Sequence, residues 1–159
     1  MIIVRRVATG VASHFKARFG EWISALILLN WGLVLSCLGP IFDRPAMAWL
    51  AEIGGQQQWG VACYSIGLAR TLALVLNGTF AGTPWSRFSP HVRALMSVLS
   101  CLVWTSVSLS VLSQSDISQI GIGLAVYPVL ALTDLFSCAC ASLDARNSDE
   151  VHRYGRAAR

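Results

Sequence analysis

Arg70 and Asp134 are the residues of this chain whose type and position point most directly to chemistry. Each is the one formally charged side chain within a long apolar run, Arg70 in residues 59–80 and Asp134 in residues 120–141. A charge at the centre of a bilayer costs about 2.5–3.5 kcal/mol, so neither side chain is expected to face lipid. Each therefore needs a partner inside the protein.

The two charges lie at similar depth if both runs cross a membrane in the same direction. Arg70 lies eleven residues after Trp59, and Asp134 lies fourteen residues after Ile120. The difference of three residues corresponds to about 4–5 Å along a helix axis, which an arginine side chain spans. We therefore predict a buried ion pair that fixes the second apolar run against the fourth.

Two functions fit such a pair. It is either a structural contact that sets helix register or part of a proton, ion or substrate path. A guanidinium stays protonated at all relevant pH values and carries protons poorly, and a carboxylate beside it stays ionised. The residue types therefore favour the structural contact, with the path through the membrane as the alternative.

Cysteine and histidine offer little further chemistry. Five cysteines lie within the apolar runs or at their ends: Cys37, Cys63, Cys101, Cys138 and Cys140. Cys138 and Cys140 would point about 200° apart on a helix, which does not suit a metal or redox pair. The three histidines lie in separate polar segments, and the sequence has no paired-carboxylate motif or glycine-rich phosphate loop. We expect no enzymatic activity, no catalytic residue, no metal and no cofactor.

The elements that must position Arg70 and Asp134 are four apolar runs, at residues 22–42, 59–80, 94–113 and 120–141. A bilayer core about 30 Å thick requires roughly 20 apolar residues in a helix. The chain is 55% hydrophobic and only 13% charged, which is outside the usual composition of soluble proteins. We predict a single all-α polytopic membrane domain with four transmembrane helices and a polar tail at 142–159.

Basic residues predict the orientation of these helices. Ten of the twelve Lys and Arg residues fall in three segments expected on one side of the membrane: Arg5, Arg6, Lys16, Arg18, Arg87, Arg93, Arg146, Arg153, Arg156 and Arg159. The loops on the other side hold only Arg44. Because basic loops stay in the cytoplasm, we expect both termini there. The dispersed positive charge favours anionic lipid over nucleic acid as a partner.

Two shorter elements are predicted outside the spans. Residues 2–19 alternate apolar and basic positions with helical spacing, which indicates an interfacial helix within the cytoplasmic arm 1–20. A disordered basic arm is the alternative. On the opposite side, Ala46–Ile53 should form a short helix with Pro45 in its first turn and Gly54 at its end.

Polar and small residues within the runs predict how the helices pack. We expect six polar side chains to form contacts between helices: Asn30, Asn77, Ser97, Ser100, Thr105 and Ser108. Gly60, Gly67 and the Gly121–Ala125 step should allow close approach of backbones. In an oligomer, the serine-rich face of the third run could instead line a pore.

Three stretches, at residues 67–78, 89–94 and 123–135, resemble small four-span membrane proteins of bacteriophages and prophages of Gram-negative bacteria. The resemblance covers roughly residues 20–145. It implies residence in the host inner membrane, and some proteins of this size and layout are holins. We therefore expect a non-enzymatic protein that acts by self-association or partner binding. A small transporter or channel subunit, or an accessory subunit of a larger membrane complex, are the alternatives.

Overall fold

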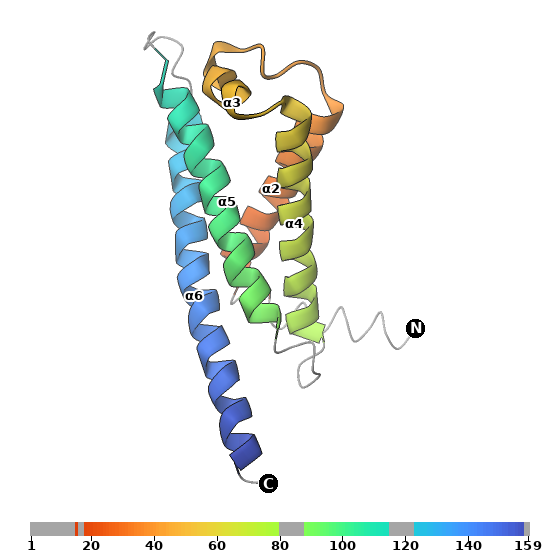
Figure 1. Cartoon of the computed structure of the whole chain (residues 1–159), viewed down its shortest axis with the longest axis vertical. Coiled ribbons are helices and arrows are strands. Elements are labelled where there is room, and N and C mark those ends of the chain that lie inside the picture. The colour runs from red at the N-terminus through yellow and green to blue at the C-terminus, as the bar shows by residue number, and fades with distance from the viewer. Residues whose placement is uncertain (1–14, 16–17, 80–87, 115–122, 158–159) are drawn as a thin grey trace.

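The computed structural model describes residues 15, 18–79, 88–114 and 123–157 of the chain. Within these residues the only secondary structure is helical, in the order α2 (Phe19–Cys37), η1 (Pro45–Met47), α3 (Ala48–Ile53), α4 (Gln56–Thr79), α5 (Ser89–Leu112) and α6 (Gly123–Ala157). The four long helices form one bundle, and the short η1 and α3 lie across one end of it (Figure 1). We call this end the α3 end.

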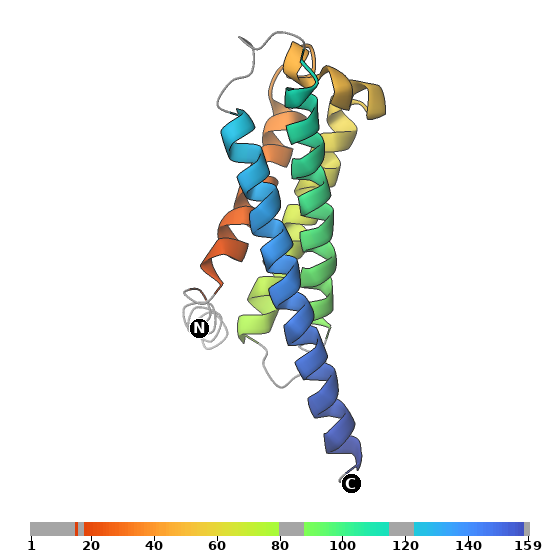
Figure 2. The same cartoon turned by 90° about the vertical axis from the view of Figure 1, so that its left-hand side faces the viewer.

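All four long helices are long and apolar enough to cross a membrane. The prediction of an all-α protein with four candidate membrane spans is therefore confirmed, and the chain has the architecture of a multi-pass membrane protein. α2 packs mainly on α4, and α5 packs mainly on α6, whereas α2 and α6 touch over a shorter length. α6 has 35 residues, or about 52 Å at 1.5 Å per residue, and projects beyond the bundle at the end opposite α3 (Figures 1 and 2).

The helix ends differ from the predicted spans. α2 ends at Cys37 rather than at residue 42, because the chain turns to an extended conformation at Leu38 before Pro40. α5 begins at Ser89, with Pro90 in its first turn, five residues before the predicted start. α6 continues to Ala157, so most of the predicted tail 142–159 is helix. α5 and α6 extend beyond the charge-free runs because a helix continues through charged residues that have partners.

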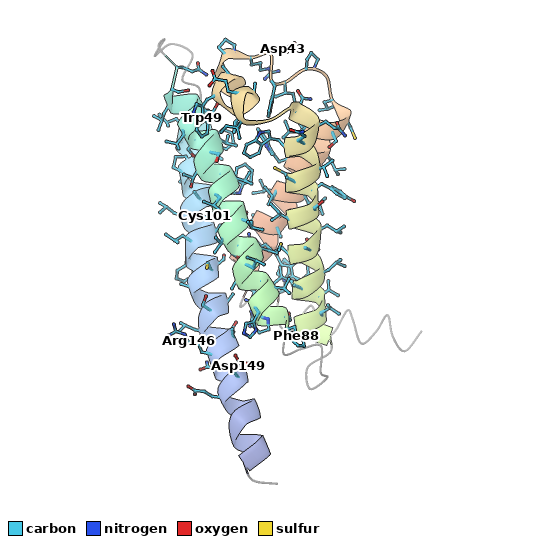
Figure 3. All side chains as sticks on the ribbon, viewed as in Figure 1. Asp43, Trp49, Phe88, Cys101, Arg146 and Asp149 are labelled. Carbon is cyan, nitrogen blue, oxygen red and sulfur yellow. The ribbon has the colours of Figure 1, made fainter. Side chains whose placement is uncertain are left out.

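The predicted short helix forms as η1 followed by α3, with Pro45 in the first turn and Gly54 at the C-terminus. Met47 and Leu50 are buried against the bundle core, so the segment covers the bundle rather than lying free. Figure 3 places Asp43 and Trp49 at this end, and Phe88 and Arg146 toward the other. The predicted interfacial helix at 2–19 falls almost entirely outside the described residues.

The bundle interior is aromatic and aliphatic toward the α3 end. The ring centroids of Trp104 and Tyr127 are 5.8 Å apart with nearly parallel planes, and Trp31 packs against both rings. Leu28 and Met47 complete this part of the core. Further from α3, Trp22, Ala25 and Leu74 form a second, smaller apolar cluster, and buried charged side chains share this part of the interior.

Glycines set the close approach of α2 and α4. A Cβ atom on Gly32 would lie 2.3 Å from the backbone nitrogen of Tyr64, and one on Gly67 would lie 2.7 Å from that of Leu29. Because side chains do not tolerate such distances, only glycine fits there. The prediction for Gly60 and Gly67 is confirmed. Gly121 lies outside the described residues, and the prediction for Ala125 is wrong because Ala125 is exposed.

Candidate functional site

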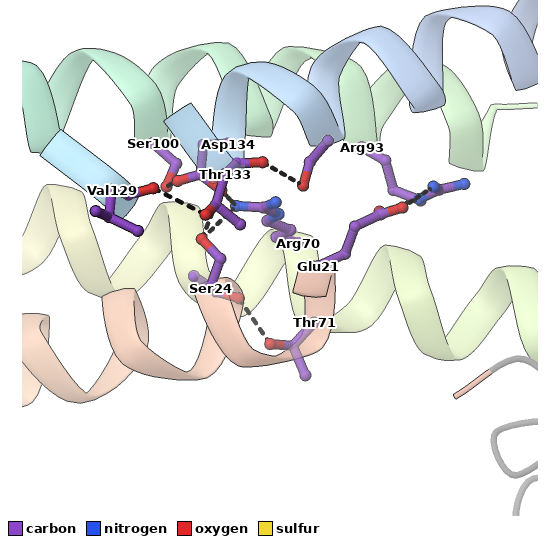
Figure 4. A network of polar contacts seen from close by, with 11 residues as sticks. Glu21, Ser24, Arg70, Thr71, Arg93, Ser100, Val129, Thr133 and Asp134 are labelled. Atoms are coloured by element: carbon purple, nitrogen blue, oxygen red, sulfur yellow. Dashed lines mark hydrogen bonds and ion pairs between the residues drawn. The ribbon is translucent and has the colours of Figure 1, made fainter. Parts of the chain in front are cut away.

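Asp134 on α6 accepts hydrogen bonds from all three other long helices. Nη1 of Arg70, on α4, lies 2.5 Å from Asp134 Oδ1, and both side chains are 0% exposed. The hydroxyl of Ser24, on α2, donates to the same oxygen over 2.5 Å, and the hydroxyl of Ser100, on α5, donates to Oδ2. We call these four residues the Asp134 cluster (Figure 4). The structure thus brings together the two charges that the sequence paired.

The helices place these groups by simple periodicity. Ser24 lies on the buried face of α2 that also carries Ala25 and Leu28. Ser100 lies one turn from Trp104 on the buried face of α5. A carboxylate has acceptor sites for several donors, so one aspartate can tie four helices together.

A second group of charges lies toward the end of the bundle opposite α3. Arg93 on α5 binds the Glu21 carboxylate on α2 with two nitrogens, at 2.9 Å from Nε to Oε2 and 2.6 Å from Nη2 to Oε1. Asp144 on α6 lies 3.2 Å from Nη1 of Arg93 and 2.9 Å from Nη2 of Arg18. We call Arg18, Glu21, Arg93 and Asp144 the Arg93 cluster.

The two clusters form one charge-balanced network. Three arginines and three acidic side chains contribute, so their formal charges cancel. Arg70 also interacts electrostatically with Glu21 and lies between Asp134 and Glu21 in Figure 4. Opposite charges in alternation lower the cost of burying each of them away from water.

The Arg93 cluster was missed by the sequence interpretation. The pattern of basic residues predicts Arg93 in a loop between the second and third runs, but its side chain is 0% exposed inside α5. Glu21 lies just before the predicted first run 22–42, yet it is buried within α2. The available signal was Pro90, which favours a helix start before Arg93 and therefore places Arg93 inside the third helix.

The six predicted packing residues divide into four groups. Ser97 and Ser100 are buried as predicted, although the Ser97 hydroxyl has no hydrogen-bond partner among the described residues. Ser108 is buried, but its hydroxyl donates to the Trp104 carbonyl of its own helix rather than across an interface. Asn30 and Thr105 are exposed, so neither side chain packs against another helix of the same chain. The side chain of Asn77 lies outside the described part of the structure.

The exposed positions of Asn30 and Thr105 have a physical reason. In a membrane helix both faces are apolar, so hydropathy alone does not reveal which face meets the bundle. Two cross-helix contacts also escaped prediction. The Ser89 hydroxyl donates to the Ala73 carbonyl over 2.8 Å, and the Ser110 hydroxyl donates to the Ala46 carbonyl over 2.9 Å.

Two cavities lie along the seam between α2 and α6. The larger, of about 600 Å³, is near the α3 end and is lined by Trp31, Met47 and Tyr127, with Arg44 among its polar groups. The smaller, of about 270 Å³, lies beside Glu21 and Asp144. The hydrogen bond from Ser24 to Asp134 joins the two helices between these depths.

The residue types in this network favour holding charge in place over carrying protons. Each arginine stays protonated, and each acidic group has a guanidinium within 4 Å. Comparisons of this chain with known proteins found no matching family model, no matching curated protein and no matching solved structure.

Proposed function

We propose that this chain is a non-enzymatic integral membrane protein that acts by self-association or by binding a membrane partner. The observation that carries the proposal is the Asp134 cluster, in which one buried carboxylate is satisfied by donors from three other helices. Such a contact favours a bundle that is assembled once and then presents a fixed outer surface. Its activity accordingly lies in that surface rather than in a reacting side chain.

The proposal includes a location. We place the chain in the inner membrane of a bacterial host, as in phage-type proteins, with both ends in the cytoplasm. The distribution of basic residues supports this orientation, because Arg44 is the one basic residue in the segment between α2 and α4 at the α3 end. Anionic lipid is the expected partner of the basic segments at the opposite end.

The experiment that tests the proposed function measures assembly and leakage together. The tagged full chain is expressed at low level in bacteria, and fluorescence photobleaching in native membrane vesicles counts the copies per particle while co-purification identifies bound proteins. A dimer, a larger assembly or a stoichiometric partner is expected, with the membrane potential maintained. Single copies without any partner would contradict the proposal.

A holin-like protein would also act by self-association, but its assembly would permeabilise the membrane and kill the cell. It requires helices to rearrange into a lesion, and the buried network opposes that rearrangement. Immediate loss of membrane potential on expression would therefore favour a holin and argue against a fixed bundle.

The larger cavity favours a second candidate, a small transporter or channel subunit. Its volume of about 600 Å³ and its mostly apolar lining, which includes the charged Arg44, suit an amphipathic ligand. Transport predicts substrate-dependent proton flux in proteoliposomes that disappears in Asp134→Asn. Equal flux in protein-free vesicles would exclude it.

A further inference from the structure

The outward face of α2 carries a regular stripe that the bundle leaves uncovered. Ile23, Leu26 and Leu33 are 39%, 48% and 42% exposed, and Asn30 and Cys37 are exposed as well. Their spacing alternates three and four residues, from 23 to 26, 30, 33 and 37. This is the spacing of the a and d positions of a two-helix seam, with Asn30 and Cys37 both at a positions. α2 lies at the periphery of the bundle, where a neighbour can reach it (Figure 2).

Asn30 adds a hydrogen-bonding amide to this mostly apolar stripe. It lies near the middle of the 19-residue helix, and its amide has no hydrogen-bond partner among the described residues. An unsatisfied amide in hydrocarbon is costly, so asparagine in a span normally bonds to a neighbouring helix. The side chain therefore indicates a contact on the outside of the bundle.

The chemistry of asparagine indicates which helix makes that contact. An amide has both donor and acceptor groups, so two copies of one asparagine satisfy each other across a two-fold axis. All copies of a chain enter the membrane in the same orientation, which makes the two α2 helices parallel and places each a position beside its equivalent. A single asparagine at an a position also fixes the register and the number of strands.

We infer that the protein forms a parallel homodimer through α2, with the two Asn30 amides hydrogen-bonded at the seam. This inference rests on the proposed function and names the surface that self-association uses. The Asp134 cluster holds α2 in each bundle, so the stripe is presented in one fixed direction. Cys37 of one copy then lies beside Cys37 of the other near the α3 end.

Cys37 supplies the test. Native membranes holding the full chain are treated with copper–phenanthroline and air, which takes one electron and one proton from each of two adjacent thiols and joins them as a disulfide. We expect a covalent dimer from the unaltered chain and none from Cys37→Ala. Asn30→Leu should lower the cross-linked fraction by about tenfold, the effect of losing an interhelical hydrogen bond of about 1–2 kcal/mol. Thr105→Val, which removes another exposed polar group, should leave the fraction unchanged.

The alternative outcomes separate this inference from the proposed function. Photobleaching that counts two or more copies while Cys37 does not cross-link would overturn the α2 seam but leave self-association standing. A different membrane protein lost only from Asn30→Leu would show that the stripe binds another partner, and would also overturn the homodimer. Equal cross-linking in Asn30→Leu and the unaltered chain would overturn the role of the amide. Circular dichroism of each variant checks that the bundle still folds.

Discussion

The carboxylate of Asp134 shows how a polar group is accommodated in an apolar bundle. Its two oxygens accept from Arg70, Ser24 and Ser100, so no oxygen is left without a donor. These hydrogen bonds therefore stabilise contacts among all four long helices. Removing one member should therefore affect the whole bundle rather than one contact.

We predict that Asp134→Asn destabilises the protein by about 3–5 kcal/mol, because Arg70 then remains charged and buried without its counter-ion. The measurement is the midpoint of denaturant unfolding in detergent, together with accumulation in the membrane. The exchange of charges, Arg70→Asp with Asp134→Arg, should recover part of the loss. Normal stability of both single variants would contradict a structural role for the pair.

The Arg93 cluster gives a matched prediction at a different depth. Arg93→Gln leaves Glu21 buried without its bidentate arginine partner. We expect the free energy of unfolding to fall by about 3–5 kcal/mol in the same measurement. Arg146→Gln is the control, since Arg146 is exposed on α6 and should change stability by less than about 0.5 kcal/mol. A loss in Arg93→Gln no larger than in this control would mean that Glu21 and Arg93 are not coupled.

At the scale of the elements, the contact between α2 and α4 depends on the absence of side chains. Gly67→Ala places a Cβ atom 2.7 Å from the backbone of Leu29, so the two helices must move apart. We expect a loss of about 1–3 kcal/mol, typical of overpacked cores. Gly39→Ala is the control because a Cβ there meets nothing within 4 Å. Equal melting temperatures for the two variants would argue against this close approach.

The turn after α2 depends on one glutamine at the start of α4. Gln56 Oε1 accepts from the backbone nitrogens of Ile41 and Phe42, and its Nε2 donates to the Leu35 carbonyl. Gln56→Ala leaves these groups without their partner, so we expect faster protease cleavage between α2 and α3 and a loss of about 1–3 kcal/mol. Gln57→Ala, at an exposed neighbour, should cleave at the unaltered rate.

At the scale of the whole molecule, the asymmetry of basic residues predicts its direction in the membrane. Reporter fusions after residue 159 should be active only as cytoplasmic reporters, and fusions in the loop at Asp43 only as periplasmic ones. The C-terminal end of α6 and Asp43 lie at opposite ends of the molecule (Figures 1 and 3). A periplasmic signal from the C-terminal fusion would overturn the proposed orientation.

The amino-acid sequence alone determined the class of this protein. Four apolar runs are enough to predict four membrane-spanning helices, because a bilayer requires each span to satisfy its own backbone hydrogen bonds. The sequence also paired Arg70 with Asp134, because buried charges in apolar runs are few and their depths can be compared by counting residues.

The tertiary structure decided which face of each helix is inside. In the structure, Ser24 and Ser100 bind Asp134, and Arg93 lies in the core beside Glu21 rather than in a loop. Asn30 lies on the outward face of α2. These outcomes depend on the rotation of each helix about its own axis. That rotation is set by close packing at Gly32 and Gly67 and by the polar contacts between helices. It cannot be predicted from the sequence, because apolar residues occur on every face of these helices.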